Sequence, residues 1–149
     1  MASRFGLEIR AAEARDAEDL ATLLALGGGA KGAEGLIARL DKMRSGDGVV
    51  LIAAEWGPPS GVIALNWAWT LTADLRVAYI TSLVVAPEAR RRGIARLLLK
   101  AASQSARAAH CGQITILAPA DSQPLRDFCV ATGFVESADV FTRSLRKGR

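Results

Sequence analysis

Apolar residues spaced three and four positions apart predict four helices. The strongest pattern runs from Gly93 to about Ala109 and forms one apolar side, made of Ile94, Leu97, Leu98, Ala101 and Ala102. A similar pattern predicts a helix over Ala33–Arg44. Asp16 could cap a helix that continues to about Leu26, and a last helix over Pro124–Ala131 stops at Gly133.

Runs of apolar and β-branched residues between turn signals predict about seven strands. A helix between two of them makes Val77–Val85 and Gln113–Leu117 a parallel pair, whereas short turns make the other neighbours antiparallel. The expected fold is α/β (α+β): a mixed, mostly antiparallel sheet with helices on both faces, in one domain over residues 1–149. The other expected strands are Leu7–Arg10, Val49–Ala54, Val62–Thr70, Phe134–Val135 and Val140–Leu145.

Composition agrees with a globular domain and excludes several kinds of site. Half of the 149 residues are apolar and 23% are charged. The two cysteines and single histidine cannot complete a four-ligand zinc site, so we expect no metal. His110 and Cys111 are adjacent and point to different sides of most backbones, which argues against a coupled Cys–His pair. We see no secretory signal and no membrane helix, so a cytoplasmic setting is expected.

Charge is distributed unevenly along the chain. Residues 1–75 carry a net charge of −3, and residues 76–149 carry +7. This asymmetry predicts that an anion meets the second half, and either a nucleic acid or a phosphorylated cofactor would fit. A nucleic-acid role is the weaker interpretation, because no aromatic residues are interleaved with the arginines and no groove-reading motif is present.

The segment Arg90–Ala95, which we call the cradle, carries the clearest chemical signal. It lies between a predicted strand and a predicted helix, where unpaired N–H groups and the helix dipole attract anions. Gly93 leaves room for a ligand against the backbone, and Arg90, Arg91 and Arg92 add positive charge. An isolated run of arginines is usually a solvated turn, but this setting favours a diphosphate site.

The spacing Arg90-x-x-Gly93-x-Ala95 resembles the motif Q/R-x-x-G-x-G/A of the GNAT superfamily of acyl-coenzyme A-dependent N-acyltransferases. The preceding segment Ser82–Pro87 resembles the end of that family's fourth strand, and Gly133-Phe134 after a short helix resembles its G-F element. The order of predicted elements agrees with the family along almost the whole chain. The resemblance is specific for the fold and the cofactor, acetyl-CoA.

The resemblance implies where the cofactor would bind. The backbone of Leu83, Val84 and Val85 would pair with the pantetheine arm, as an added strand does. The parallel strands would splay apart, and the thioester would sit in the gap. Ser122 occupies the place where many relatives have an asparagine that contacts the cofactor. The diphosphate would be held beside Arg90 by the N–H groups of Arg91, Arg92, Gly93, Ile94, Ala95 and Arg96.

The catalytic positions depart from the family pattern. Slots that often hold a carboxylate base in relatives hold Tyr79, Thr81 and Leu117 here. Tyr79 and Thr81 are expected to share a strand face with Leu83 and Val85. A phenol is a poor base at neutral pH, but Tyr79 could order a water that takes the proton. Relatives often place a tyrosine acid four residues before the G-F glycine, where this chain has Cys129.

The sequence therefore predicts an N-acetyltransferase that moves an acetyl group from acetyl-CoA to a primary amine by direct attack in a ternary complex. The acceptor would be a small-molecule or a protein amine, with no nucleic acid and no membrane as partner. A non-catalytic acyl-CoA-binding or regulatory module on the same fold is the alternative, since no carboxylate fills the expected slots. Self-association into a homodimer is left open.

Overall fold

The computed structural model describes residues 3–4, 6–28, 33–117, 122–137 and 140–146. The chain divides into two compact units, residues 1–117 and residues 118–149. The first unit contains a sheet and three α-helices, and the second contains helix α4 (Gln123–Ala131). None of the helices in the described ranges has both the length and the apolar character that crossing a membrane requires.

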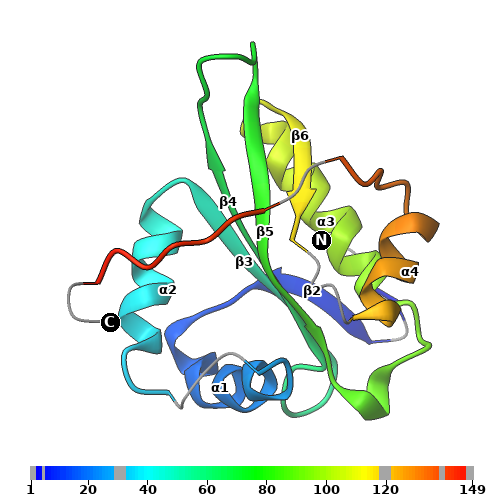
Figure 1. Ribbon diagram of the computed structural model, residues 1–149. Coiled ribbons are helices and arrows are strands. Elements are labelled where there is room, and N and C mark those ends of the chain that lie inside the picture. Colours follow the sequence, from blue (N-terminus) through cyan, green and yellow to red (C-terminus); the bar gives the residue numbers. More distant parts are fainter. Residues whose placement is uncertain (1–2, 5, 29–32, 118–121, 138–139, 147–149) are drawn as a thin grey trace. The chain divides into compact units, whose positions relative to one another are not determined.

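The sheet of the first unit has the strand order β1-β2-β3-β4-β5-β6 (Figure 1). All neighbouring strands are antiparallel except β5 and β6, which are parallel, as the sequence predicted. A two-residue strand, β1 (Ser3–Arg4), extends the β2 edge and was not predicted. The five longer strands are β2 (Leu7–Ala11), β3 (Gly48–Ala54), β4 (Gly61–Ala68), β5 (Arg76–Val85) and β6 (Cys111–Ile116).

The prediction of about seven strands is wrong. Residues 134–137 and 140–146, in the second unit, have no regular secondary structure. The N–H of Phe134 instead donates to the carbonyl of Cys129 at 2.9 Å and completes the end of α4. Val140, Phe141 and Leu145 are at least 60% exposed, so burial does not favour an extended strand there. Strand propensity depends on partner strands and buried neighbours, which a local sequence pattern does not supply.

Helices cover both faces of the sheet, as expected (Figure 1). Helix α1 (Ala17–Leu26) and helix α2 (Leu36–Ser45) lie on one face, and α3 (Ile94–Ala108) lies on the other. Gly27, after α1, contacts Val84, whereas Gly61 lies against the α3 side chains. Val84 stands opposite Val62 in β4, so these two side chains share a face of the sheet. Gly61 is adjacent to Val62 and therefore faces the other side. The contact with α1 and the contact with α3 are thus on opposite faces.

Helix α3 packs closely on the sheet at Gly61, which has no side chain. A Cβ built on Gly61 would come within 3.0 Å of both Ile94 Cγ2 and Leu98 Cδ1. The buried residues of α3 recur every four positions: Ile94, Leu98, Ala102 and Ala106. This line of apolar side chains fixes where the N-terminal end of α3 lies on the sheet.

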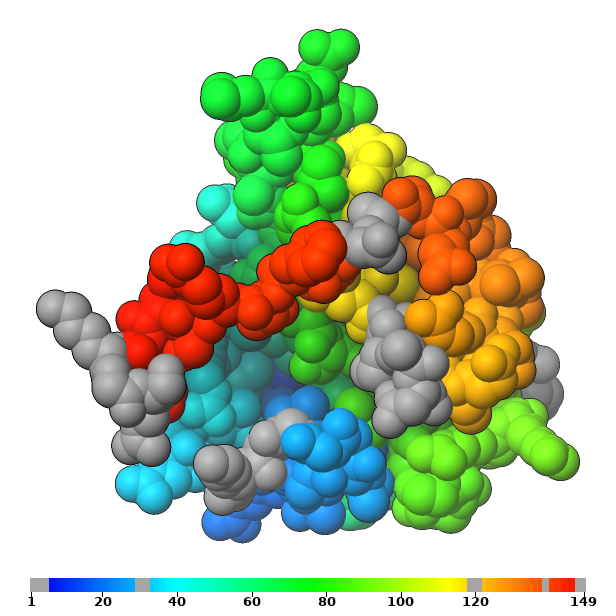
Figure 2. All heavy atoms as spheres, viewed as in Figure 1, coloured from blue at the N-terminus to red at the C-terminus, as the bar shows by residue number. Residues whose placement is uncertain are grey.

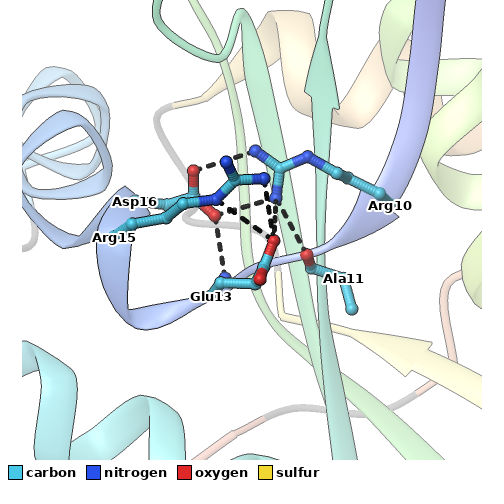
Figure 3. A network of polar contacts seen from close by, with 5 residues as sticks. All are labelled: Arg10, Ala11, Glu13, Arg15 and Asp16. Carbon is cyan, nitrogen blue, oxygen red and sulfur yellow. Dashed lines mark hydrogen bonds and ion pairs between the residues drawn. The ribbon is translucent and has the colours of Figure 1, made fainter.

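The entry to α1 is held by a network of ion pairs and hydrogen bonds (Figure 3). Both guanidinium nitrogens Nη1 and Nη2 of Arg10 donate to the carboxylate of Asp16, each at 2.9 Å. The same carboxylate accepts a hydrogen bond from the backbone N–H of Glu13 at 2.8 Å. Glu13 is the N-cap of the short 3-10 helix η1 (Ala14–Asp16), which precedes α1. Asp16 is buried, and its pKa is lowered mainly by the hydrogen bonds from Arg10.

The tip of the β4–β5 hairpin projects from the first unit (Figure 2). Trp69 lies beyond the end of β4 and is 61% exposed, and the guanidinium carbon of Arg76 lies 5.2 Å from the centre of its ring. That distance is within the range of a cation–π contact. Arg76 also forms an ion pair with Asp47 at 3.2 Å, which links the hairpin to the start of β3.

Candidate functional site

The pairing between the parallel strands β5 and β6 ends part-way along β5. Their pairing runs from Arg76 opposite Cys111 to Ile80 opposite Ile116, where β6 ends. Strand β5 continues for five more residues, to Val85, paired only with β4. Among the described residues no strand pairs with residues 81–85 on the side of β6, and we refer to this unpaired side as the gap.

Backbone groups of Leu83 and Val85 point toward this gap. The N–H of Ala86 donates to Ser60 on the β4 side at 2.8 Å. Because backbone groups alternate in direction along a strand, Val84 also faces β4, and Leu83 and Val85 face the opposite edge. This edge offers donors and acceptors that an extended ligand could pair with.

A β-bulge occurs in β5 beside the gap. Ile80 stands opposite Leu65 and Ser82 stands opposite Ala64, which leaves Thr81 without a partner in β4. The hydroxyl of Thr81 donates to the carbonyl of Ala64 at 3.4 Å. An extra residue in one strand shifts the alternation of side chains by one position. Residues an even number of positions apart across the bulge therefore lie on opposite faces of the sheet.

Because of the bulge, Tyr79 lies on a different face of the sheet from the one that the sequence predicted. Strict alternation predicted that Tyr79 shares a face with Leu83 and Val85, and this is wrong. Tyr79 shares a face with Ser82 and Val84, on the side of the sheet that α1 and α2 cover, and it is 38% exposed. The pairing across β4 shows this, with Asn66 opposite Tyr79, Ala64 opposite Ser82 and Val62 opposite Val84.

The cradle has the backbone geometry that the sequence predicted. Helix α3 begins at Ile94, and Gly93 directly before it is left-handed, with φ 75°. No side chain of the described residues caps the first turn, so its leading N–H groups have no partner among those residues. A Cβ built on Gly93 would meet no atom within 4 Å. A helix N-terminus with these features is suited to binding an anion.

The arginines in and next to the cradle differ in their hydrogen-bond partners and in their exposure. Arg90 Nε donates to the carbonyl of Val85 at 3.4 Å, a long hydrogen bond. Arg92 Nη2 donates to both carboxylate oxygens of Glu55, at 2.6 and 3.0 Å. Arg91 and Arg96 are exposed, and the backbone of Arg91 has a left-handed conformation, with φ 68°. The positive charge of Arg92 is thus paired within the protein.

Sequence reasoning did not identify Glu55. It follows β3 directly and lies 37 positions before Arg92, so no local pattern connects the two. Its place on the α3 side of the sheet follows from the alternation along β3, in which Ala53 stands opposite Gly61. Only the pairing of β3 with β4 brings this carboxylate to the cradle.

The remaining predicted residues, Ser122 and Cys129, belong to the second unit. Ser122 immediately precedes α4 and its side chain makes no capping hydrogen bond. Cys129 is buried in α4, and burial raises the pKa of its thiol, which Arg126 offsets only in part. The N–H groups of Gly133 and Phe134 bond to carbonyls of the last turn, and this Schellman motif ends the helix.

No cluster of three or more His, Cys, Asp or Glu side chains that could hold a metal ion occurs in the part of the chain described above. The chemistry that the site offers is the backbone chemistry of the open β5 edge and the cradle. Both are in the first unit and adjacent in sequence, since β5 ends at Val85 and the cradle begins at Arg90.

A family model for the acetyltransferase (GNAT) family matches residues 18–134. The chain belongs to this family. The resemblance seen in Arg90-x-x-Gly93-x-Ala95 is thereby confirmed. No curated protein sequence gives a significant match.

Solved structures of other GNAT proteins show the same fold. An acetyltransferase from Trypanosoma brucei is 22% identical with a TM-score of 0.78, covering 93% of this chain and 99% of that one. An aminoglycoside N-acetyltransferase in complex with CoA is 19% identical with a TM-score of 0.81, covering 94% and 95%. Glucosamine-6-phosphate N-acetyltransferase from Arabidopsis thaliana is 14% identical with a TM-score of 0.77, covering 94% and 99%.

Proposed function

We propose that this GNAT chain is an N-acetyltransferase that moves the acetyl group of acetyl-CoA to a primary amine. The observation that carries the proposal comes from the described residues: an edge of β5 without a partner strand is followed, after a short turn, by an uncapped helix N-terminus. An extended pantetheine arm and a diphosphate match these two features in shape and charge. The CoA complex of the aminoglycoside N-acetyltransferase, a structure with the same fold, supports this choice of ligand.

The geometry of β5 and of the cradle supports their proposed binding roles, and the family resemblance supports the role proposed for Ser122. Leu83 and Val85 would pair through their backbone groups with the pantetheine arm, beside Val84. The diphosphate would accept hydrogen bonds from the N–H groups of the cradle and of Arg96, with Arg90, Arg91 and Arg96 adding charge. Ser122, in the second unit, is proposed to donate one hydrogen bond to the cofactor.

The proposed reaction is one direct transfer in a ternary complex. The amine nitrogen attacks the thioester carbonyl carbon, the C–S bond breaks, and CoA leaves as a thiol once its sulfur has gained a proton. A backbone N–H at the open edge of β5 would stabilise the oxyanion. Tyr79 is proposed to order a water that takes the proton of the amine, and Cys129 to give a proton to the leaving sulfur. The raised pKa of Cys129 keeps its thiol protonated at neutral pH.

Isothermal titration of the full chain with acetyl-CoA tests the first half of the proposal. We expect saturable binding, and an absence of heat at high micromolar ligand would contradict it. An acceptor screen that detects the released CoA thiol then tests transfer. The panel should contain aminoglycosides, amino sugars, polyamines, amino acids and peptides with free amines.

A non-catalytic acyl-CoA-binding module is the second candidate. The slots at Tyr79, Thr81 and Leu117, which often hold a carboxylate in relatives, hold none here. Binding of acetyl-CoA without thiol release over the whole amine panel would favour this function. Release with one acceptor class would exclude it and would also name the substrate. A cytoplasmic location and a homodimer stay predictions.

A further inference from the structure

The ion pair between Glu55 and Arg92 joins two distant segments at the cradle. Both carboxylate oxygens of Glu55 lie within 3.0 Å of the same nitrogen, Nη2 of Arg92. The Glu55 side chain is 20% exposed and the Arg92 side chain 49% exposed, so solvent screens the carboxylate end of this pair less than the guanidinium end. The contact therefore ties the end of β3 to the turn between β5 and α3.

The tied turn has an unfavourable backbone conformation. Arg92 lies between two left-handed residues, Arg91 with φ 68° and Gly93 with φ 75°. The left-handed backbone conformation is unfavourable for a residue that has a Cβ. The conformation of Arg91 therefore needs support from the surrounding structure. The neighbouring side-chain contact of the turn, from Arg90 to the carbonyl of Val85, is long at 3.4 Å. The short contact of Glu55 with Arg92 is the stronger tether.

We infer that Glu55 is a positioning residue that sets the cradle for the diphosphate through Arg92. This inference rests on the proposed function. Donors that are already oriented bind a ligand without the cost of ordering them, so the tether increases affinity. Glu55 also brings a negative charge near an anion site, and that charge by itself would decrease affinity. The two effects have opposite signs, and a neutral substitution separates them.

The test is titration of acetyl-CoA into the wild-type chain and into Glu55→Gln. If Glu55 positions the cradle, the Kd for acetyl-CoA rises about fivefold in the variant. If Glu55 is only a nearby negative charge, the Kd falls. Glu88→Gln is the matched control, because Glu88 is an exposed carboxylate in the short helix η2 (Pro87–Ala89) just before the same turn. We expect its Kd to be unchanged or lower.

Two further measurements separate positioning from a general loss of structure. In an Arg92→Gln background, Glu55→Gln should add no further loss, because it acts through Arg92. Affinity for S-acetylpantetheine, which lacks the diphosphate, should be the same in wild type and Glu55→Gln. An equal loss for both ligands, or an unchanged or lower Kd for acetyl-CoA, overturns the inference while leaving the proposed function intact. A wild-type chain that does not bind acetyl-CoA overturns both.

Discussion

Gly27, at the end of α1, lies directly against the side chain of Val84, in the part of β5 that continues beyond its pairing with β6. A Cβ built on Gly27 would come within 2.9 Å of Val84 Cγ2. The C-terminal end of α1 can therefore approach the open stretch of β5 only because residue 27 has no side chain. This contact sets the distance between α1 and the strand that we propose to bind the cofactor.

Gly27→Ala is expected to lower the free energy of unfolding by about 1–2 kcal/mol, because an added methyl group overpacks this contact. Val84→Ala removes the atom that the new methyl group would meet. The double variant should therefore be less destabilised than the sum of the two single changes, as measured by urea unfolding. Strict additivity would show that α1 shifts freely and that this contact does not fix its position.

Asp16→Asn is expected to lower the free energy of unfolding by about 2 kcal/mol. The substitution removes the charge that Arg10 binds at two points, and it leaves the half-buried guanidinium with a weaker acceptor. Asp74→Asn, at an exposed position of the hairpin tip, is the control and should change stability by less than about 0.5 kcal/mol. Equal effects of the two substitutions would contradict a stabilising role of the network in Figure 3.

The same pair predicts how stability depends on pH. The pKa of Asp16 is lowered in the folded chain, so its contribution is fully present above the unfolded value of about 3.9. The contribution is lost as the pH falls through the folded value. Wild type should thus lose stability more steeply than Asp16→Asn below about pH 4. Unfolding curves at a series of pH values would show this, and parallel curves would rule it out.

Substitutions at Gly93 separate backbone strain from anion binding. Gly93→Ala has room for its Cβ but keeps the left-handed conformation at a cost of about 1 kcal/mol, so stability falls and acetyl-CoA still binds. Gly93→Glu adds a carboxylate in front of the open N–H groups and should abolish binding. Titration calorimetry compares the two variants. Equal affinities would place the diphosphate away from the cradle.

Replacement of the Cys129 thiol tests its proposed role as an acid. With an acceptor identified, Cys129→Ala should lower kcat about tenfold or more and leave the Kd of acetyl-CoA unchanged. A purely packing role would instead lower the unfolding free energy and leave kcat within about twofold. Turnover and urea unfolding measured on the same variant decide between the two roles.

The sequence by itself determined the local parts of this protein. Four helices and five long strands lie close to their predicted ranges, because apolar periodicity and the turn residues at Gly93 and Gly133 act over a few neighbouring positions. The cradle was also readable, since a strand, an arginine turn, a glycine and a helix follow one another directly. The resemblance to the GNAT family rested on this segment, on Ser82–Pro87 and Gly133-Phe134, and on the order of elements, and the family model confirmed it.

Tertiary structure decided what depends on pairing between distant segments. The bulge at Thr81, visible only in the register of β4 against β5, moved Tyr79 to the face of Val84. The pairing of β3 with β4 brought Glu55 to Arg92, and the fold placed Gly27 against Val84. Residues 140–145 have a strand-like pattern but remain without strand structure. Strand pairing and side-chain contact across tens of residues are set by the competition among all packing arrangements, and a local pattern does not contain that information.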